Sequence, residues 1–230
     1  MNELFLSSAT IGVVISLLAY QLGSYLKKKT NLAVLNPLLI SIILVIAFLL
    51  IFDIDYDSYN YSAKYLSYLL TPATVSLAIP LYEKLSLLKK HFGAIIISIS
   101  VGVLTSLVSI LLLSMLFGLS YTEYVTLLPK SITTAIGIGI SEEFGGYVSI
   151  TATAIIITGI LGNMIGEITC KIFRIKHPIS KGLAFGTSSH AIGTTKAMEL
   201  GQIEGAMSSL SIVVSGLLTV LLASIFAMLY

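Results

Sequence analysis

Long apolar runs separated by short polar segments dominate the pattern along this chain. Six runs contain no Asp, Glu, Lys, Arg or His: 4–26, 30–52, 65–82, 92–121, 144–166 and 205–230. A helix needs about 20 predominantly apolar residues to cross a bilayer, so each run predicts a membrane helix. Two weaker segments are interrupted, 126–141 by Pro129 and Lys130 and 182–199 by His190 and Lys196. The pattern therefore predicts an all-α fold, a polytopic membrane helical bundle.

The composition excludes an ordinary water-soluble domain. Of the 230 residues, 56% are hydrophobic and 10% are charged, whereas about 25% of a soluble globular chain is charged. Too few polar groups remain to cover a surface exposed to water. The net charge of +2 is too small to indicate a nucleic-acid partner. The single cysteine, Cys170, excludes an internal disulfide and a cysteine-rich metal site, and we expect no metal or other cofactor.

Basic residues form three groups that order the membrane spans. Ten of the 13 Lys and Arg residues lie in these groups: 27–29; Lys84, Lys89 and Lys90; Lys171, Arg174, Lys176 and Lys181. The positive-inside rule places all three groups on the cytoplasmic side. The second and third groups can share that side only if 126–146 enters and leaves from the outer side. We therefore predict a single integral membrane domain over 1–230 with an outer N-terminus, about seven spans including 182–199, one re-entrant segment and a cytoplasmic C-terminus.

Under this topology, outer loops carry most acidic residues, among them Glu143 and Glu199. The three helices within 32–121 and the three within 148–230 then have opposite orientations, which predicts an inverted 3+3 repeat. A shift of 116 residues places Thr71 on Thr187 in these two repeats. Inverted repeats are characteristic of secondary transporters. Chance spacing of similar apolar helices explains the same pattern, because few residues are identical across the shift.

One helix in each proposed repeat contains residues that interrupt helices. Pro72 and Pro80 each remove a backbone donor, although a tolerated kink explains that helix equally well. The segment 186–196 has two glycines and five hydroxyl residues around His190 and Lys196. A helix broken at mid-membrane exposes N–H groups with partial positive charge, which suits a carboxylate. Ser and Thr can instead bond to their own helix backbone. We predict two broken helices.

Candidate binding residues gather in these segments. The positive-inside rule leaves Lys130 and Lys196 unexplained at membrane depth, where a charge usually has a partner or a water-filled cavity. We predict that they bind a small carboxylate anion together with neighbouring groups: Thr71, Pro72, Ser131, Thr133, Thr134, Thr187, Ser188, Ser189, His190, Thr194 and Thr195. The alternative is that both lysines snorkel to the interface. His190 could titrate and couple transport to protons, or it could be a structural hydrogen-bonding group.

Enzymatic signatures are missing from the sequence. Ser188, Ser189 and His190 are adjacent, but no acid lies nearby to orient the imidazole as a catalytic triad requires. No paired His/Glu metal motif, phosphate-binding loop or dinucleotide fingerprint occurs. We therefore do not expect an enzyme.

Four segments resemble the LrgB/CidB family: 69–82, 128–134 (Leu128-Pro-Lys-Ser-Ile-Thr-Thr134), 186–199 and 205–210. The likeness covers nearly the whole chain, and 186–199 is its most specific part. The family usually has Pro after the two threonines of the second segment, where this chain has Ala135. That difference bears on the backbone geometry there and not on membership.

The resemblance implies a multi-pass protein of the bacterial inner (cytoplasmic) membrane that acts with a small LrgA/CidA-like membrane protein. It implies two functions: holin- or antiholin-like regulation of murein hydrolase activity and autolysis, and transport of small monocarboxylates of the pyruvate and glycolate type. A hole-forming protein needs helices that associate, but neither a broken helix nor clustered hydroxyl and lysine groups. We predict a monocarboxylate permease that influences autolysis, with holin/antiholin-like regulation without transport as the alternative. The oligomeric state, with a homo-oligomer among the options, stays open.

Overall fold

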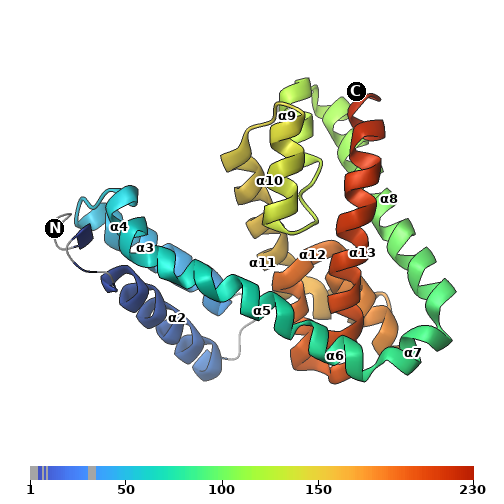
Figure 1. Ribbon diagram of the computed structural model, residues 1–230, viewed down its shortest axis with the longest axis horizontal. Helices are drawn as coiled ribbons and strands as arrows, with labels where there is room; N and C mark the ends of the chain where they lie inside the picture. The colour runs from blue at the N-terminus through green and yellow to red at the C-terminus, as the bar shows by residue number, and fades with distance from the viewer. Residues whose placement is uncertain (1–4, 7, 9, 31–34) are drawn as a thin grey trace. The chain divides into compact units, whose positions relative to one another are not determined.

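The computed structural model describes residues 5, 6, 8, 10–30 and 35–230, and these residues form helices and connecting segments without a strand (Figure 1). The starts of the predicted spans 4–26 and 30–52 include residues 4, 7, 9 and 31–34, which lie outside the described residues. The chain divides into two compact units, 1–76 and 77–230. The prediction of a single membrane domain stays a prediction.

The first unit is a small helical group. Its helices are α2 (Ile11–Thr30), α3 (Pro37–Ile51), α4 (Tyr56–Ala63), the 3₁₀ helix η1 (Lys64–Leu69) and α5 (Leu70–Ser76). Helix α3 begins where a side chain and a proline favour it. The Asn36 side chain accepts hydrogen bonds from the N–H groups of Leu38 and Leu39, and Pro37 occupies the first helical position, where no N–H is needed.

The second unit carries the longest apolar helices. Its helices are α6 (Ala78–Glu83), α7 (Leu85–Lys90), α8 (Phe92–Phe117), α9 (Tyr121–Leu127), α10 (Thr134–Glu143), α11 (Val148–Ile172), α12 (Pro178–Leu200) and α13 (Gln202–Ala227). Among the described residues, α8, α11 and α13 are long and apolar enough to cross a membrane, by length and composition. Helix α3 is apolar but shorter. The structure thus supports three spanning helices, and the predicted count of seven is not confirmed.

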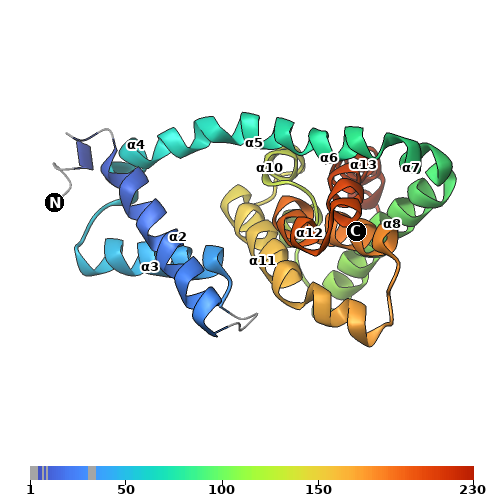
Figure 2. The same cartoon turned by 90° about the horizontal axis from the view of Figure 1, so that it is seen from below.

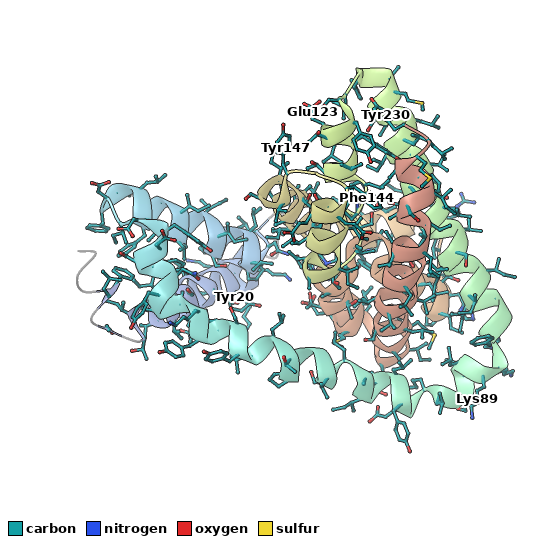
Figure 3. All side chains as sticks on the ribbon, turned by 45° about the horizontal axis from the view of Figure 1, so that its top comes forward. Tyr20, Lys89, Glu123, Phe144, Tyr147 and Tyr230 are labelled. Carbon is teal, nitrogen blue, oxygen red and sulfur yellow. The ribbon has the colours of Figure 1, made fainter. Side chains whose placement is uncertain are left out.

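The two ends of the second unit differ in their side chains. At one end, α11 has Lys171 in its last turn and is followed by Arg174, and α8 begins just after Lys90; we call this the basic end. At the other end Tyr124 stacks on Tyr230, and we call this the tyrosine end. Figure 3 shows the two ends, with Lys89 at one and Glu123, Tyr147 and Tyr230 at the other. The positive-inside rule predicts that the basic end is cytoplasmic.

Helices α9 and α10 form a hairpin, hairpin 1, that enters from the tyrosine end. Its first helix starts with a capping box between Ser120 and Glu123. The Ser120 N–H, and to a smaller extent the Ser120 hydroxyl, donates to the Glu123 carboxylate and lowers the pKa of that carboxyl. Both arms pack on the first turns of α11, where the Thr151 hydroxyl donates to Thr126 O at 2.8 Å and lies 2.6 Å from Ser141 Oγ. The turn between them, 128–133, lies deeper in the unit. The segment 126–146 thus contains most of a helical hairpin, and its re-entry from the outer side stays a prediction.

Helix α12 is broken and doubles back, forming hairpin 2. Ser189 has φ −138° and ψ 15°, and His190 has φ 42° and ψ −138°, so neither continues a helix. Before the break, Phe185 lies against Gly166 of α11 and Ser189 against Gly162. After it, Thr195 bonds to Asn163 and Lys196 pairs with Glu167. The chain thus climbs along α11 from the basic end and returns to the same end.

Contacts with α13 confirm this reversal. The entering arm runs parallel to α13, because Gly182 lies at Glu204 and Gly186 at Ser208. The returning arm runs antiparallel, because Thr194 bonds to Ser208 and Met198 lies at Gly205. In Figure 2, α12 lies between α11 and α13.

The predicted topology of 182–199 is corrected by this geometry. The segment does not span; it is a second re-entrant hairpin that starts and ends at the basic end. Glu199 therefore lies at the same end as Glu167, since both bond to Lys196, and not in an outer loop. Helix α13 consequently finishes at the tyrosine end, where Phe226 O accepts a hydrogen bond from Tyr124, so a cytoplasmic C-terminus is not supported. A hydrophobicity pattern cannot distinguish a spanning helix from two short arms of the same total length.

A helix followed by a hairpin occurs twice in the second unit, in opposite orientations. A shift of 56 residues carries the start of α8, Phe92, onto the start of α11, Val148. The same shift relates the two helix ends: Leu119 N–H donates to Ser114 O at 3.0 Å, and Ile175 N–H donates to Cys170 O at 2.8 Å. The residues before these donors both have positive φ, 61° at Gly118 and 55° at Arg174.

The hairpins obey the same shift of 56 residues. The returning arms begin at Thr134 in α10 and at His190 in α12, and both read Ala-Ile-Gly directly afterwards, at 135–137 and 191–193. This repeat, 92–143 and 148–199, differs from the predicted repeat of 32–121 and 148–230, which is not confirmed. The arms of the two hairpins are short and share few identical residues, so the sequence alone does not predict this repeat.

The proline-containing helix is interrupted less than α12. The run from Leu70 to Pro80 is split between α5 and α6, with Leu77 between them at φ −65° and ψ −19°. These angles are close to helical values, so the interruption is a kink. This agrees with the alternative that Pro72 and Pro80 are tolerated within a kinked helix. Of the two predicted broken helices, only α12 is fully broken.

Candidate functional site

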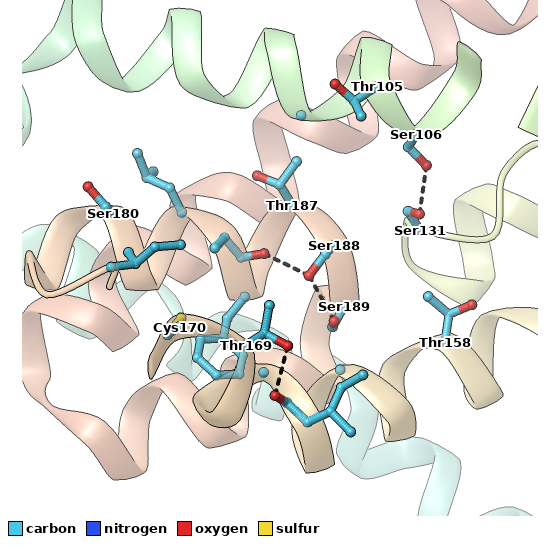
Figure 4. A pocket seen from close by; sticks show the side chains of 18 of the residues that line it. Thr105, Ser106, Ser131, Thr158, Thr169, Cys170, Ser180, Thr187, Ser188 and Ser189 are labelled. Carbon is cyan, nitrogen blue, oxygen red and sulfur yellow. Dashed lines mark hydrogen bonds between the residues drawn. The ribbon is translucent and has the colours of Figure 1, made fainter. Parts of the chain in front are cut away.

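A cavity of about 650 Å³ lies where the two hairpin tips approach each other in the second unit (Figure 4). It is lined from α8 by Ser98, Gly102, Thr105 and Ser106; from the tip of hairpin 1 by Lys130 and Ser131; from α11 and the segment after it by Thr158, Gly162, Ile165, Gly166, Thr169, Cys170 and Ile175; and from hairpin 2 by Ser180, Leu183, Ala184, Phe185, Thr187, Ser188 and Ser189. Small ligands commonly bind in cavities of 300–1,000 Å³.

The tip of hairpin 1 contributes the charge. Lys130 and Ser131 reach the middle of α8, where the Ser131 and Ser106 hydroxyl oxygens lie 2.9 Å apart. The ammonium of Lys130 donates to Ser131 Oγ at 3.3 Å. Lys130 is the only side chain among the lining residues that carries a formal charge. A cation held at this depth without a lining carboxylate favours an anionic occupant.

The tip of hairpin 2 contributes hydroxyl groups. Ser188 donates to Ala184 O at 2.7 Å, and its oxygen lies 2.9 Å from that of Ser189 (Figure 4). Thr187 is 9% exposed, and among the described residues its hydroxyl oxygen is the one buried side-chain polar atom without a hydrogen-bond partner. Leaving such a group unpaired costs about 1–3 kcal/mol. An acceptor in the cavity would remove that cost.

Helix α11 allows hairpin 2 to come close because it has glycine where the tip packs. A Cβ on Gly162 would overlap Ser189 Oγ, so any side chain there would displace the tip. Asn163 donates from Nδ2 to Ile192 O at 2.9 Å and to Thr195 Oγ1 at 3.1 Å. His190 Nε2 lies 3.0 Å from Ile155 O. These contacts fix the strained residues at the break.

The structure brings together five of the predicted site residues: Lys130, Ser131, Thr187, Ser188 and Ser189 all line the cavity. The cavity therefore joins Lys130 and the 187–189 segment, with hairpin 2 arriving as two arms and not as one spanning helix. Binding of a carboxylate by these groups stays a prediction.

The other predicted site residues do not line the cavity: Thr133, Thr134, His190, Thr194, Thr195 and Lys196. Lys196 is ion-paired with Glu167 at 3.3 Å and Glu199 at 3.2 Å, so of the two lysines predicted to balance the substrate charge the structure brings only Lys130 to the cavity. Thr194 donates to His190 O and belongs to the packing of hairpin 2 on α13. Thr71 and Pro72 are exposed in α5 of the first unit, and the cavity is lined by the second unit alone.

Several lining residues were not predicted. Thr105 and Ser106 in α8 and Thr158 and Thr169 in α11 are hydroxyl residues inside strongly apolar helices. Gly159, Gly162 and Gly166 follow one face of α11 at helical spacing. Both patterns are visible in the sequence, and close approach of another backbone is the usual reason for such glycines.

No metal-binding arrangement occurs in the described part of the chain, where no group of three or more His, Cys, Asp and Glu side chains comes together. The chemistry available at the cavity is therefore that of one ammonium group, several hydroxyl groups and the backbone at the α12 break.

Comparisons with known proteins match almost the whole chain. A sequence model of the LrgB-like family matches residues 16–229. The antiholin-like protein LrgB of Bacillus mycoides (strain KBAB4) is 38% identical over 216 residues, 94% of each chain. The antiholin-like proteins LrgB of Bacillus cereus (strain B4264) and Bacillus anthracis (strain CDC 684 / NRRL 3495) show the same identity and coverage. No solved structure matches this chain.

Proposed function

Since the chain belongs to the LrgB-like family, we propose that it is a membrane permease for small monocarboxylates of the pyruvate and glycolate type. The observation that supports this most is the meeting of two opposed hairpins around a cavity with one cation, Lys130, and a buried unpaired hydroxyl, Thr187. Re-entrant hairpins and broken helices at mid-membrane are the means by which transporters place polar groups there.

The two tips divide the recognition of a carboxylate. Lys130 supplies the counter-charge from hairpin 1, and Thr187 supplies an O–H donor from hairpin 2. Ser131 is the repeat equivalent of Thr187, since 56 residues separate them, so the two hairpins offer one hydroxyl each from matching positions. A carboxylate has two oxygens and can accept from both. The remaining wall is apolar at Ile165, Leu183 and Phe185, which suits a short carbon chain.

Antiholin-like regulation is the second candidate, because the relatives carry that name. In this proposal the chain acts with a small LrgA/CidA-like membrane protein in the bacterial inner membrane and influences murein hydrolase activity and autolysis. The cavity favours transport as the molecular activity, since association of helices alone does not require a charged, hydroxyl-lined space. Altered carboxylate flux would then change autolysis indirectly.

Uptake of labelled pyruvate, lactate and glycolate into proteoliposomes, with and without the small partner, tests the proposal. We expect saturable uptake that Lys130→Met abolishes or strongly weakens and that Lys196→Met leaves largely intact. Lys196 is the matched control, because its charge is already paired with Glu167 and Glu199. Absence of uptake of all three acids under both conditions would favour regulation without transport.

A further inference from the structure

Beyond the hairpin tips, packed residues that we call the seam separate the cavity from the tyrosine end. A second void of about 10 Å³ shares Ser106, Ser131 and Thr187 with the cavity. Its other walls include Leu128 of hairpin 1 and Ser215 and Thr219 of α13. These residues lie on the tyrosine-end side of the tips, because α13 runs from Gln202 at the basic end toward that end.

The seam toward the tyrosine end has small side chains on α13. Ser215, Thr219 and Ala223 recur every four residues, so they share one face of the helix, and all three are buried. Ala223 packs in one cluster with Leu107 and Ile110 of α8. Buried hydroxyls in a dry seam are costly unless bonded, and Ser215 meets this by donating to Ser211 O.

Two tyrosines lie at the tyrosine end of the seam. The rings of Tyr124 and Tyr230 stack with centroids 4.6 Å apart. The Tyr124 hydroxyl donates to Phe226 O at 2.9 Å. The Tyr230 hydroxyl donates to Ser114 O at 3.2 Å and to Leu119 O. The pair thereby joins hairpin 1, the end of α8 and the end of α13.

The inverted repeat shows that this closure is not imposed by the fold. Ser180 and Ala184 of hairpin 2 are exposed and line the cavity. Their equivalents in hairpin 1, 56 residues earlier, are Tyr124 and Leu128, which are 0% and 1% exposed. Equivalent positions are therefore open at the basic end and closed at the tyrosine end. Two repeats built alike have a second arrangement in which the open and closed ends are exchanged.

We propose that Tyr124 and Tyr230 are the gate of an outward half-path, which opens along Ser215 and Thr219 when hairpin 2 closes over the cavity. This inference rests on the proposed transport function, because a gate has a purpose only where a solute crosses. The present structure is the inward arrangement. Opening separates the two rings and breaks the hydroxyl bonds to α13 and α8, while the hairpin tips keep their substrate groups at the same depth.

Cysteine labelling in proteoliposomes of defined orientation tests the gate. In a Cys170→Ala background, Thr219→Cys reports the outward seam and Ser180→Cys reports the cavity. Each is labelled with an impermeant maleimide from its own side, alone and combined with Tyr124→Phe or Tyr230→Phe. The phenylalanine variants keep the stacked rings and remove only the hydroxyl bonds. Tyr147→Phe is the matched control, since Tyr147 is an exposed tyrosine at the same end, outside the stacked pair.

We expect each gate variant to speed labelling at position 219 about 3- to 10-fold, the loss of one or two hydrogen bonds, and to slow labelling at position 180. The control should change neither rate. Unchanged rates at position 219 in both gate variants would overturn the proposal, and so would faster labelling at both positions, which indicates loosened packing. The labelling rates of the two gate variants are interpreted separately. If one variant does not fold, the rates of the other test the gate. The labelling needs no substrate, so the gate can fail while transport holds, and the reverse.

Discussion

Hairpins 1 and 2 reach the same part of α11 from opposite ends, but their turns are built differently. Hairpin 1 uses a six-residue turn, 128–133, with Pro129 and Lys130 at its tip. Hairpin 2 reverses within two residues, Ser189 and His190. The longer turn can carry a cation because it has room for a long side chain beside the cavity. The tight turn places short hydroxyl residues against Gly162 and is supported by bonds from Asn163 and His190. One hairpin supplies charge and the other supplies neutral donors on a fixed backbone.

The largest effect is expected when the charge is removed from hairpin 1. A hydrogen bond to a charged group contributes about 1.5–3 kcal/mol, so Lys130→Met should weaken carboxylate binding roughly 10- to 150-fold. Binding is measured by titration of the purified protein with pyruvate. Lys196→Met is the control and should bind normally. Equal, normal binding by both variants would mean that neither lysine contacts the substrate.

The packing of hairpin 2 is expected to depend on the absence of a side chain at Gly162 of α11. Gly162→Ala places a methyl group where Ser189 Oγ lies, and overpacking of this kind costs about 1–3 kcal/mol. The thermal midpoint in detergent should fall and substrate binding should weaken. Gly139→Ala is the control, because nothing lies within 4 Å of a Cβ at that position of hairpin 1. A normal midpoint for Gly162→Ala would show that hairpin 2 does not press on α11.

The smallest effect is expected at His190. Its ring contacts Ile155 O and does not line the cavity, which favours the structural alternative over proton coupling. His190→Gln keeps a donor for that carbonyl and removes the titrating group, so the pH dependence of transport should not change. A shift of the pH profile in this variant would restore His190 as a coupling residue.

Much of hairpin 1 and little of hairpin 2 could be predicted from the sequence. The three basic groups predict that 126–146 re-enters, because charge is a strong and local topological signal. The same rule leaves the charge of Lys130 unexplained, and this marks Lys130 as a candidate binding residue. In 182–199 the hydroxyl and glycine content predicted the break, but not the reversal, because the direction after a break depends on two backbone angles and on contacts with α11 and α13. The ion pair of Lys196 with Glu167 could not be predicted, because Glu167 lies on another helix.

The predicted repeat of 32–121 and 148–230 is not confirmed, and the 56-residue repeat was not predicted, for a related reason. The 116-residue shift compares apolar helices, which look alike whether or not they are related. The 56-residue repeat appears in capping geometry, at Gly118 and Arg174, and in the two returning arms. Those features involve few residues and no strong hydrophobic signal. Apolar composition alone does not distinguish a structural repeat from unrelated helices of similar hydrophobicity.

The central claim is that the two hairpins enter from opposite ends and meet, and the sidedness of their returning arms tests it most directly. Glu143 and Glu199 finish these arms, are both exposed and occupy equivalent positions of the repeat. Single cysteines at 143, 176 and 199, in a Cys170→Ala background, are labelled with an impermeant maleimide in intact and in opened cells. The account predicts that 199 is labelled from the same side as 176 and that 143 is labelled from the other side. Labelling of 143 and 199 from one common side, opposite to 176, would contradict it and restore a spanning helix at 182–199.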